Sequence, residues 1–318
     1  MCSMTHSDND TRKLHGRNWR DALGDLEGAY APNTLRSYRS DFEIFEAWCA
    51  ASGTCALPAS PETVAAFFKS QQEIVSPTTL SRRQCAIRKI HRLLRLANPT
   101  DDEAVSIALR RARRLKGTRA RQALGLTRDL REQLVAAAPD HLKGTRDAAL
   151  LCVGYDTLCR RSELAALQIE DLKPNRDGTM TILIRRAKDD QFGAGRLGLL
   201  SKKTVGRLRD WLRQAGLKTG ALFRAIDRHG HVRTEALDGS SINRIIKAMA
   251  RDARLPKATA EGLSGHSMRV GRAQDLMLDG FDLLPIMKAG GWKSYKIVGR
   301  YVENVELAKL LKTRGAWD

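Results

Sequence analysis

The sequence lacks long apolar runs, an apolar N-terminal segment and paired cysteines. Its longest weakly charged apolar run, residues 148–159, is too short to cross a bilayer. The first 15 residues are polar, unlike a secretory signal. The cysteines form no CxxC pair, and none is spaced from a histidine as metal ligands are: Cys2, Cys49, Cys55, Cys85, Cys152 and Cys159. We therefore expect a cytoplasmic protein with no disulfide and no bound metal or other cofactor.

Acidic residues are also scarce. The chain has 55 Lys and Arg against 36 Asp and Glu, a net charge of +19. The excess is greatest in residues 76–125, which hold 13 Lys and Arg, 3 Asp and Glu, and no Phe, Tyr or Trp. Positive charge favours a polyanionic partner. Proteins that bind single strands usually interleave aromatic stacking residues with basic ones. The pattern therefore favours the phosphates of duplex DNA over single strands.

Repeats and low-complexity tracts are absent, and 42% of the residues are hydrophobic, which is enough for packed cores. A length of 318 residues suggests about two domains. We expect a flexible N-terminal arm over residues 1–30 and a helical domain over residues 31–116. A basic linker over residues 117–126 and a second domain over residues 127–318 follow.

Helical periodicity dominates both domains. In the first, apolar residues recur every three or four positions at Leu35, Tyr38, Phe42, Phe45 and Trp48. Capping patterns predict helix starts at Ser60-Pro61, at Ser76-Pro77, and at Thr100 with Glu103.

Strand-like sequence is confined to the second domain. Residues 180–187 are rich in β-branched side chains, and residues 197–201 follow after a glycine-containing turn. His229 and His231 flank Gly230, which suggests a polar turn between two strands rather than a metal site. The prediction is a mainly α protein: an all-helical N-terminal domain and an α+β C-terminal domain with a small antiparallel sheet.

The C-terminal half carries cationic, titratable and hydrogen-bonding groups within otherwise apolar helices: Arg160, Arg161, His266, Arg269, Trp292, Arg300 and Tyr301. Cleavage of a phosphodiester needs a nucleophile, cations around the phosphoryl oxygens and a proton donor for the leaving oxygen. Arginine suits the second role because it stays charged and can bond two oxygens at once. On a helix, the spacing of three between His266 and Arg269 places both on one face. The set is suited to a phosphate site.

Three separated motifs strengthen this interpretation. They are residues 265–271 (GHSMRVG), residues 289–292 (AGGW), and Arg300-Tyr301 nine residues after the tryptophan. Together they resemble the second conserved box of the tyrosine recombinase, or phage integrase, family. Residues 157–172 (TLCRRSELAALQIEDL) resemble its first box. The resemblance covers roughly residues 30–312, with the motifs in the family's order.

The resemblance implies the roles of the core residues. Tyr301 would attack the scissile phosphate and form a 3′-phosphotyrosyl bond, releasing a 5′-hydroxyl. Arg160 and Arg269 would hold the non-bridging oxygens. His266 would hydrogen-bond the phosphate and assist proton movement, and Trp292 would donate its indole N–H to the same group.

Two further roles follow from the resemblance. Glu163 would orient a catalytic side chain, and Lys188 would protonate the leaving 5′-oxygen. Neither metal nor ATP would be required, because fixed cations stabilise the phosphate and the covalent bond conserves its energy.

Two features depart from the family pattern. Arg160 is followed by Arg161, so the first box offers two candidate arginines; the register against Ser162-Glu163 favours Arg160. Lys188 is followed by two aspartates, which would favour its charged form. Lys202 and Lys203 therefore remain alternative proton donors.

The family also suggests DNA contacts. In the first domain these would come from Thr34, Arg36, Ser37, Arg82, Arg83, Arg88 and Lys89, and in the second from Arg244 and Lys247. Arginine can read a guanine edge, whereas most of the other charges would contact phosphates.

By the same resemblance, residues 31–116 would be a SAM-like core-binding domain and residues 127–318 the catalytic domain, forming a C-shaped DNA clamp. A C-terminal helix, residues 304–313, would dock into a neighbouring subunit. The chain, a monomer in solution, would act as a homotetramer on two inverted-repeat sites of double-stranded DNA, through a Holliday junction. It would be prokaryotic, phage-encoded or plasmid-encoded. The alternatives are a type IB topoisomerase and a non-catalytic DNA-binding protein.

Overall fold

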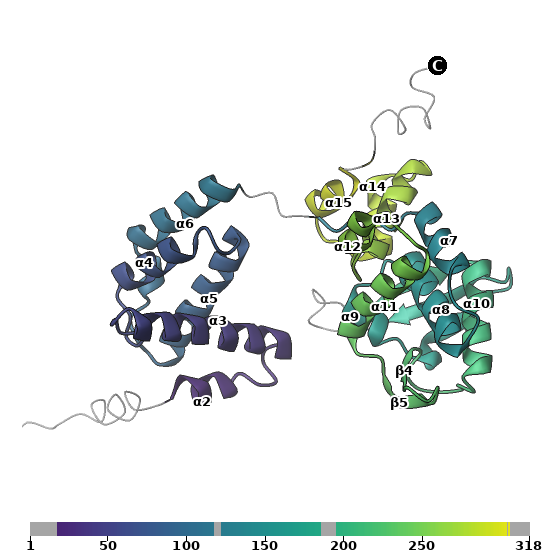
Figure 1. Ribbon diagram of the computed structural model, residues 1–318, viewed down its shortest axis with the longest axis horizontal. Coiled ribbons are helices and arrows are strands. Elements are labelled where there is room, and N and C mark those ends of the chain that lie inside the picture. Colours follow the sequence, from purple (N-terminus) through teal and green to yellow (C-terminus); the bar gives the residue numbers. More distant parts are fainter. Residues whose placement is uncertain (1–17, 118–121, 186–194, 304, 306–318) are drawn as a thin grey trace, which may run out of the picture. The chain divides into compact units, whose positions relative to one another are not determined.

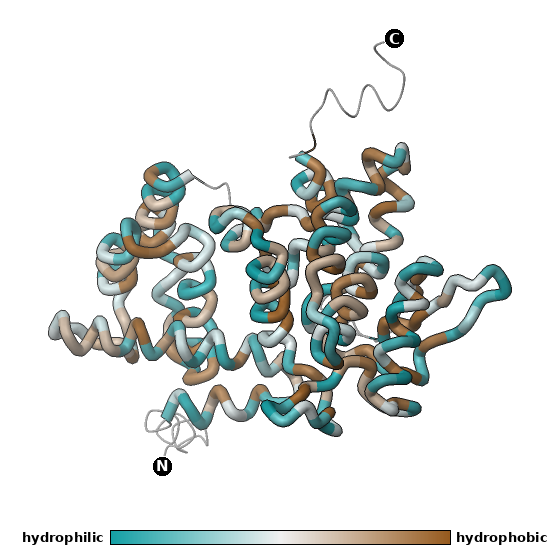
Figure 2. Tube along the Cα trace, turned by 45° about the vertical axis from the view of Figure 1, so that its right-hand side comes forward, coloured by the Kyte–Doolittle hydropathy of each residue, from teal (hydrophilic) through white to brown (hydrophobic). Residues whose placement is uncertain are grey.

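The computed structural model describes residues 18–117, 122–185, 195–303 and 305. The chain divides into an N-terminal unit, Met1–Ala120, and a C-terminal unit, Arg121–Asp318 (Figure 1). Each unit has its own hydrophobic core. Apolar and polar residues alternate along most helices, as expected for helices that bury one face (Figure 2). None of the described helices is both long enough and apolar enough to cross a membrane.

The described part of the N-terminal unit is helical, as predicted. Its elements are α2 (Trp19–Gly24), α3 (Pro32–Ala51), α4 (Pro61–Gln71), α5 (Pro77–Leu93), the 3-10 turn η1 (Pro99–Asp101) and α6 (Glu103–Lys116). The Ser60 and Ser76 side chains accept the N–H groups of Thr63 and Thr79, which confirms both predicted caps. The third predicted cap is wrong. Asp102 rather than Thr100 caps α6, because Thr100 lies in η1.

Helix α2 corrects the predicted arm. Residues 18–30 were expected to be unstructured, yet Asn18 caps a short helix whose Trp19, Ala22 and Leu23 are buried against the core. The Trp19 ring packs edge-on against Phe42 at 4.9 Å between ring centres. A spacing of three and four puts these apolar residues on one face, but a helix of this length leaves only a weak periodic signal. Residues 1–17 lie outside the described part of the chain.

The C-terminal unit contains helices and two small antiparallel sheets. Its elements are α7 (Arg128–Ala136), α8 (Leu142–Thr157), α9 (Arg161–Ala165), η2 (Ile169–Asp171), β1 (Leu172–Pro174), β2 (Met180–Ile184), β3 (Arg196–Leu200), α10 (Lys202–Gln214), β4 (Arg224–Ile226), β5 (Val232–Ala236), α11 (Gly239–Asp252), α12 (Lys257–Gly262), α13 (Ser267–Leu278), α14 (Leu283–Gly290) and α15 (Tyr295–Val302).

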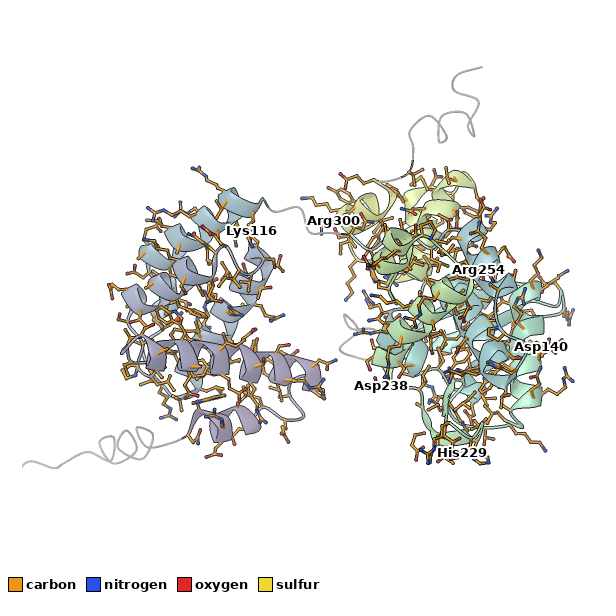
Figure 3. The ribbon with its side chains drawn as sticks, viewed as in Figure 1. Lys116, Asp140, His229, Asp238, Arg254 and Arg300 are labelled. Carbon is orange, nitrogen blue, oxygen red and sulfur yellow. The ribbon has the colours of Figure 1, made fainter. Side chains whose placement is uncertain are left out.

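The central helix of this unit is α8, which is buried along most of its length. It packs against α10, α13 and β3. The predicted sheet is confirmed in the order β1-β2-β3, with β2 and β3 paired from Met180↔Leu200 to Ile184↔Arg196. The predicted polar turn is also present: β4 and β5 form a hairpin with His229 at its turn (Figure 3). These elements bring the first box, at the end of α8, next to the second box on α13.

Part of the predicted linker belongs to the C-terminal unit. Leu126 is completely buried in that unit's core, and Leu124 and Leu126 donate backbone hydrogen bonds to Gly262 and Ser267. The linker assignment of residues 122–126 was therefore wrong. Basic, glycine-containing composition suggested exposure, but the alternation of Leu124, Gly125 and Leu126 fits a closely packed segment.

Candidate active site

Tyr301 and His266 form the centre of the candidate site. Tyr301 lies in the last turn of α15, and His266 is the N-cap residue of α13. His266 Nε2 lies 2.9 Å from the Tyr301 hydroxyl oxygen. Burial, reinforced by the nearby cations Arg269 and Arg160, lowers the pKa of His266 to about 4. The ring is therefore neutral at neutral pH. In the tautomer with its proton on Nδ1, it accepts the hydroxyl hydrogen of Tyr301.

Arg269 lies beside this pair and is fully buried. Its Nη1 donates to the Leu158 carbonyl, and its guanidinium carbon lies 4.0 Å from the centre of the Trp292 ring. Its Nε and Nη2 have no hydrogen-bond partner in the described part of the chain. Burial, followed by repulsion from Arg160, lowers the pKa of Arg269 to about 10. A buried cation with two unsatisfied donors is costly unless an anion binds it, so this arrangement suits a phosphate.

Trp292 supports both residues. Its side chain is buried, with one ring face toward Arg269 and the ring centre 5.4 Å from that of Tyr301. The ring of His266 is a similar 5.2 Å from Tyr301. Tyr301, His266, Arg269 and Trp292, predicted from separate motifs, are therefore brought together.

Arg160 and Glu163 are joined at the start of α9. Arg160 Nη1 donates to Glu163 Oε1 at 2.8 Å, and the Arg160 backbone N–H donates to Oε2 at 3.0 Å. Burial acts to raise the pKa of Glu163, but these hydrogen bonds, together with the positive charges of Arg196 and Arg160, outweigh it and the pKa is lowered. The carboxylate is thus ionised and fixes Arg160 near His266 and Arg269. Arg161 is exposed as the first residue of α9, and its side-chain stem lies over Gly265.

Arg196 is a residue of the site that the sequence did not reveal. Its Nη1 donates at 2.8 Å to the carbonyls of both Thr157 and Ala289, and its Nη2 donates to Glu163 at 3.1 Å. It thereby joins β3 to the end of α8, to α9 and to α14. No motif marks it, because its partners come from three separate parts of the chain.

Two glutamines were also missed. The side-chain amides of Gln122 and Gln274 both donate to the backbone carbonyl of Tyr301, at 3.3 and 3.1 Å. Neither was identified, because each bonds the main chain of a residue that is distant in the sequence.

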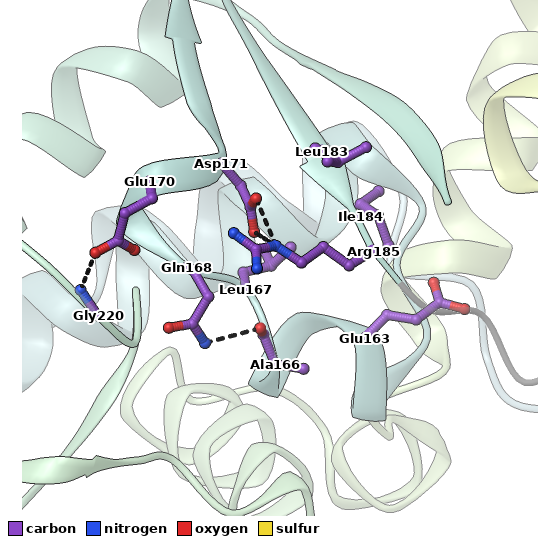
Figure 4. A pocket seen from close by; sticks show the side chains of 10 residues that line it. All are labelled: Glu163, Ala166, Leu167, Gln168, Glu170, Asp171, Leu183, Ile184, Arg185 and Gly220. Atoms are coloured by element: carbon purple, nitrogen blue, oxygen red, sulfur yellow. Dashed lines mark hydrogen bonds and ion pairs between the residues drawn. The ribbon is translucent and has the colours of Figure 1, made fainter. Parts of the chain in front are cut away.

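The candidate proton donor Lys188 lies outside the described residues. The residues on either side of that gap are well anchored. Arg185 pairs with Asp171 at 2.8 Å along a pocket of about 510 Å³ that Glu163 borders (Figure 4), and Arg196 pairs with Glu163. The described residues Arg185 and Arg196 therefore both lie close to Glu163.

The alternative lysines lie elsewhere. The side chain of Lys202 lies beside Gly178, at the opposite end of the β2–β3 hairpin from Arg196. Lys203 lies within electrostatic reach of Glu132 on α7. Neither lysine is therefore placed beside Arg196, at the end of the hairpin that borders the candidate site.

The predicted contacts on α5 separate into exposed and buried residues. Arg82 is 54% exposed and pairs with buried Asp41 at 2.6 Å. Arg83 is only 7% exposed and donates to Gln71. Arg83 is therefore withdrawn as a DNA contact, because its side chain turns into the helical core.

The other candidates in this unit are at least partly accessible. Arg88 pairs with Asp101 and donates to Thr100, and Lys89 donates to the Tyr30 hydroxyl at 2.6 Å. On α3, Arg36 is exposed and donates to Asn33, whereas Thr34 and Ser37 are half-buried.

Arg244 and Lys247 on α11 line a cleft of about 810 Å³ in the C-terminal unit. Gln122 and Ser264 also line it, so the cleft adjoins the segment that holds Tyr301 and His266. Two cations beside the site suit a polyanion. The predicted C-terminal helix, residues 304–313, lies outside the described residues except for Val305.

Comparisons with known proteins identify the family of the chain. The model of the "Phage integrase family" matches residues 125–306, and that of the "Phage integrase, N-terminal SAM-like domain" matches residues 25–98. The chain is 34% identical to an integrase/recombinase xerD homolog of Selenomonas ruminantium, over 89% of this chain and 85% of the relative. It is 29% identical to recombinase cre of Escherichia phage P1, over 91% and 89%.

Solved structures share the fold. XerH site-specific recombinase bound to a palindromic difH substrate gives a TM-score of 0.64 at 16% identity, covering 89% of this chain and 79% of that one. A lambda integrase dimer bound to a COC′ core site gives 0.60 at 14% identity, covering 96% and 83%. The mainly helical architecture with small antiparallel sheets is therefore shared with these structures.

Proposed function

Because the chain belongs to the phage integrase family and is a tyrosine site-specific recombinase, we propose that it cuts and rejoins duplex DNA at inverted-repeat sites, with Tyr301 as nucleophile. The observation that carries this proposal is the 2.9 Å approach of His266 Nε2 to the Tyr301 hydroxyl, beside the unsatisfied guanidinium of Arg269. A nucleophile next to a neutral base and a cation is the arrangement that phosphoryl transfer needs.

Cleavage would proceed by in-line displacement. The Tyr301 oxygen forms a bond to the scissile phosphorus as the bond from phosphorus to the 5′-oxygen breaks. The phenol proton passes to His266, and Lys188 supplies a proton to the departing 5′-oxygen. The products are a 3′-phosphotyrosyl bond and a 5′-hydroxyl, and attack by a 5′-hydroxyl in the reverse direction rejoins the strand.

The phosphate would sit against the cations of the site. Arg269 Nε and Nη2 are free to donate to non-bridging oxygens, and Arg160 is oriented by Glu163. These fixed cations would stabilise the charge of the transition state. The phosphotyrosyl bond keeps the energy of the broken phosphodiester, so we expect activity in EDTA and without ATP.

We propose that recombination takes place in a homotetramer on two sites, through a Holliday junction, with residues 304–313 docking between subunits. Arg244 and Lys247 would contact the DNA beside the scissile phosphate. A cytoplasmic protein of prokaryotic, phage or plasmid origin fits the bacterial and phage relatives.

A suicide-substrate assay tests the proposal. Nicked DNA carrying inverted repeats from around the gene is incubated with protein in EDTA without ATP and run on a denaturing gel. We expect a covalent protein–DNA adduct that is lost in Tyr301→Phe but kept in Tyr295→Phe, a matched control because Tyr295 is 64% exposed on the same helix.

Two results would contradict the proposal. Tight binding of these sites without an adduct would indicate a non-catalytic DNA-binding protein. An adduct that leads only to relaxation of supercoils, without joining of two sites, would indicate a type IB topoisomerase.

A further inference from the structure

The backbone carbonyl of Tyr301 lies in the last turn of α15, which ends at Val302. The last four carbonyls of a helix have no partner within the helix and need one elsewhere. Here the partners are the side-chain amides of Gln122 and Gln274, at 3.3 and 3.1 Å. Two segments remote in sequence therefore hold the end of the helix that carries the nucleophile.

Gln274 is held firmly. It lies on α13, the helix that also carries Arg269, and is 6% exposed. Its amide packs so closely on Gly125 that a Cβ there would lie 2.0 Å from Gln274 Oε1. The amide thus has little room to turn away from the Tyr301 carbonyl.

Gln122 begins a segment, Gln122–Leu126, that is fixed to the second box. Leu124 donates a backbone hydrogen bond to Gly262 at 3.1 Å, and Leu126 donates one to Ser267 at 2.8 Å. These two acceptors lie on either side of His266 in the sequence. The Leu126 backbone also packs against Gly271, where a Cβ would lie 1.9 Å from the Leu126 carbonyl oxygen. The segment therefore contacts the chain on both sides of His266 and, through Gln122, the backbone of Tyr301.

We propose that Gln122 and Gln274 are positioning residues that hold the Tyr301 phenol at His266 by bonding the main-chain carbonyl of Tyr301. This inference rests on the proposed function, because it assigns both glutamines to the cleavage step. Neither side chain would touch the DNA phosphate. Losing both donors would free the end of α15 and misplace the phenol, and misplacement by about 1 Å can cost about 100-fold in rate.

The test compares Gln122→Met, Gln274→Met and the double variant with wild type. Methionine keeps the side-chain length and removes the N–H donors. Gln214→Met is the control, since Gln214 accepts a hydrogen bond from Thr145 on the surface and does not contact Tyr301. Single-turnover cleavage of the nicked substrate is measured at saturating DNA, together with the DNA Kd and the thermal midpoint.

Each single variant keeps one donor, so we expect a loss of about 5-fold in cleavage rate. We expect a loss of about 100-fold in the double variant, more than the two single effects multiplied. The Kd and the thermal midpoint should match those of the control. A double variant that cleaves within about twofold of wild type would overturn the proposal. So would a loss that is matched by a weaker Kd or a lower midpoint, because that pattern indicates a merely structural role.

A second measurement does not depend on catalysis. Hydrogen exchange of the α15 amides in DNA-free protein should be faster in the double variant, by about 10-fold, while exchange in α10 stays unchanged. Unchanged exchange in α15 would overturn the positioning role even if cleavage were slow. Failure of the proposed function would show separately, as a wild-type protein that forms no adduct.

Discussion

The guanidinium of Arg269 lies over the ring of Trp292, 4.0 Å from its centre, and its Nε and Nη2 donate no hydrogen bond within the described part of the chain. The charge of Arg269 is kept out of water and close to Arg160 and Arg196. Under the proposed function, this site would be organised for a phosphate before DNA binds, and we expect the buried charge to cost stability in the free protein.

Replacing Arg269 with methionine should therefore raise stability and abolish activity. Removing a buried, incompletely bonded cation should stabilise the free protein by about 1–2 kcal/mol, or a few degrees in Tm. Cleavage should fall by about 1,000-fold, because a cation of the transition state is lost. Thermal unfolding and adduct formation measure the two effects, with Arg209→Met as an exposed control on α10. A Tm several degrees below wild type would contradict this account.

The pH dependence of cleavage should reflect the lowered pKa of His266. Burial lowers that pKa to about 4, so the neutral ring, which can accept the Tyr301 proton, persists in the free enzyme well below pH 6.5. At subsaturating DNA, we expect the cleavage rate to change little between pH 8 and pH 5.5 and to fall below that range. An inflection near pH 6.5 that His266→Gln removes would show instead that the ring titrates normally.

Salt dependence of DNA binding tests the cleft on α11. Arg244→Gln and Lys247→Gln should each weaken binding at low salt and reduce the slope of log K against log salt by about 1. Arg209→Gln on α10 is the control, because Arg209 is exposed and does not line the cleft. Unchanged slopes in both cleft variants would remove α11 from the DNA-binding surface.

The N-terminal unit should lose stability in mild acid because of His91. This fully buried ring accepts the Ala59 N–H at Nε2 and donates to the Ile87 carbonyl from Nδ1, and burial lowers its pKa. Protonation would place a hydrogen on His91 Nε2, which would then face the Ala59 N–H, another donor.

The lowered pKa of His91 determines the direction in which stability changes with pH. Below about pH 6.5 the unfolded chain binds the proton and the folded chain resists it, so stability falls as pH falls, by at most about 1.4 kcal/mol per unit. Hydrogen exchange of the α5 amides at pH 7 and pH 5.5 should show this loss in wild type and in His231→Gln, an exposed control, but not in His91→Gln. Equal losses of protection in wild type and both variants would refute the role of His91.

Much of the site could be predicted because short motifs place its groups locally. His266 and Arg269 are three residues apart at the start of one helix, and Glu163 reaches back to Arg160 within one turn. Local spacing fixes such relationships whatever the rest of the chain does.

The remaining residues could not be predicted, because their partners are distant in sequence. Arg196 and Ala289 are 93 residues apart, and Gln122 and Tyr301 are 179 apart. Charge patterns also could not separate Arg82 from Arg83. Adjacent residues on a helix point in different directions, and the packing of α5 against α3 and α4 decides which one is buried.

The placement of Gln122–Leu126 determines where this protein can be divided. A catalytic fragment that began at Thr127, after the basic stretch that the composition marks as a linker, would lose the backbone hydrogen bonds to Gly262 and Ser267 and the amide that holds the Tyr301 carbonyl. Domain-exchange chimaeras should therefore be joined ahead of Gln122. A junction placed only a few residues later would remove these contacts, and the resulting loss of activity would be wrongly attributed to the exchanged DNA-binding unit.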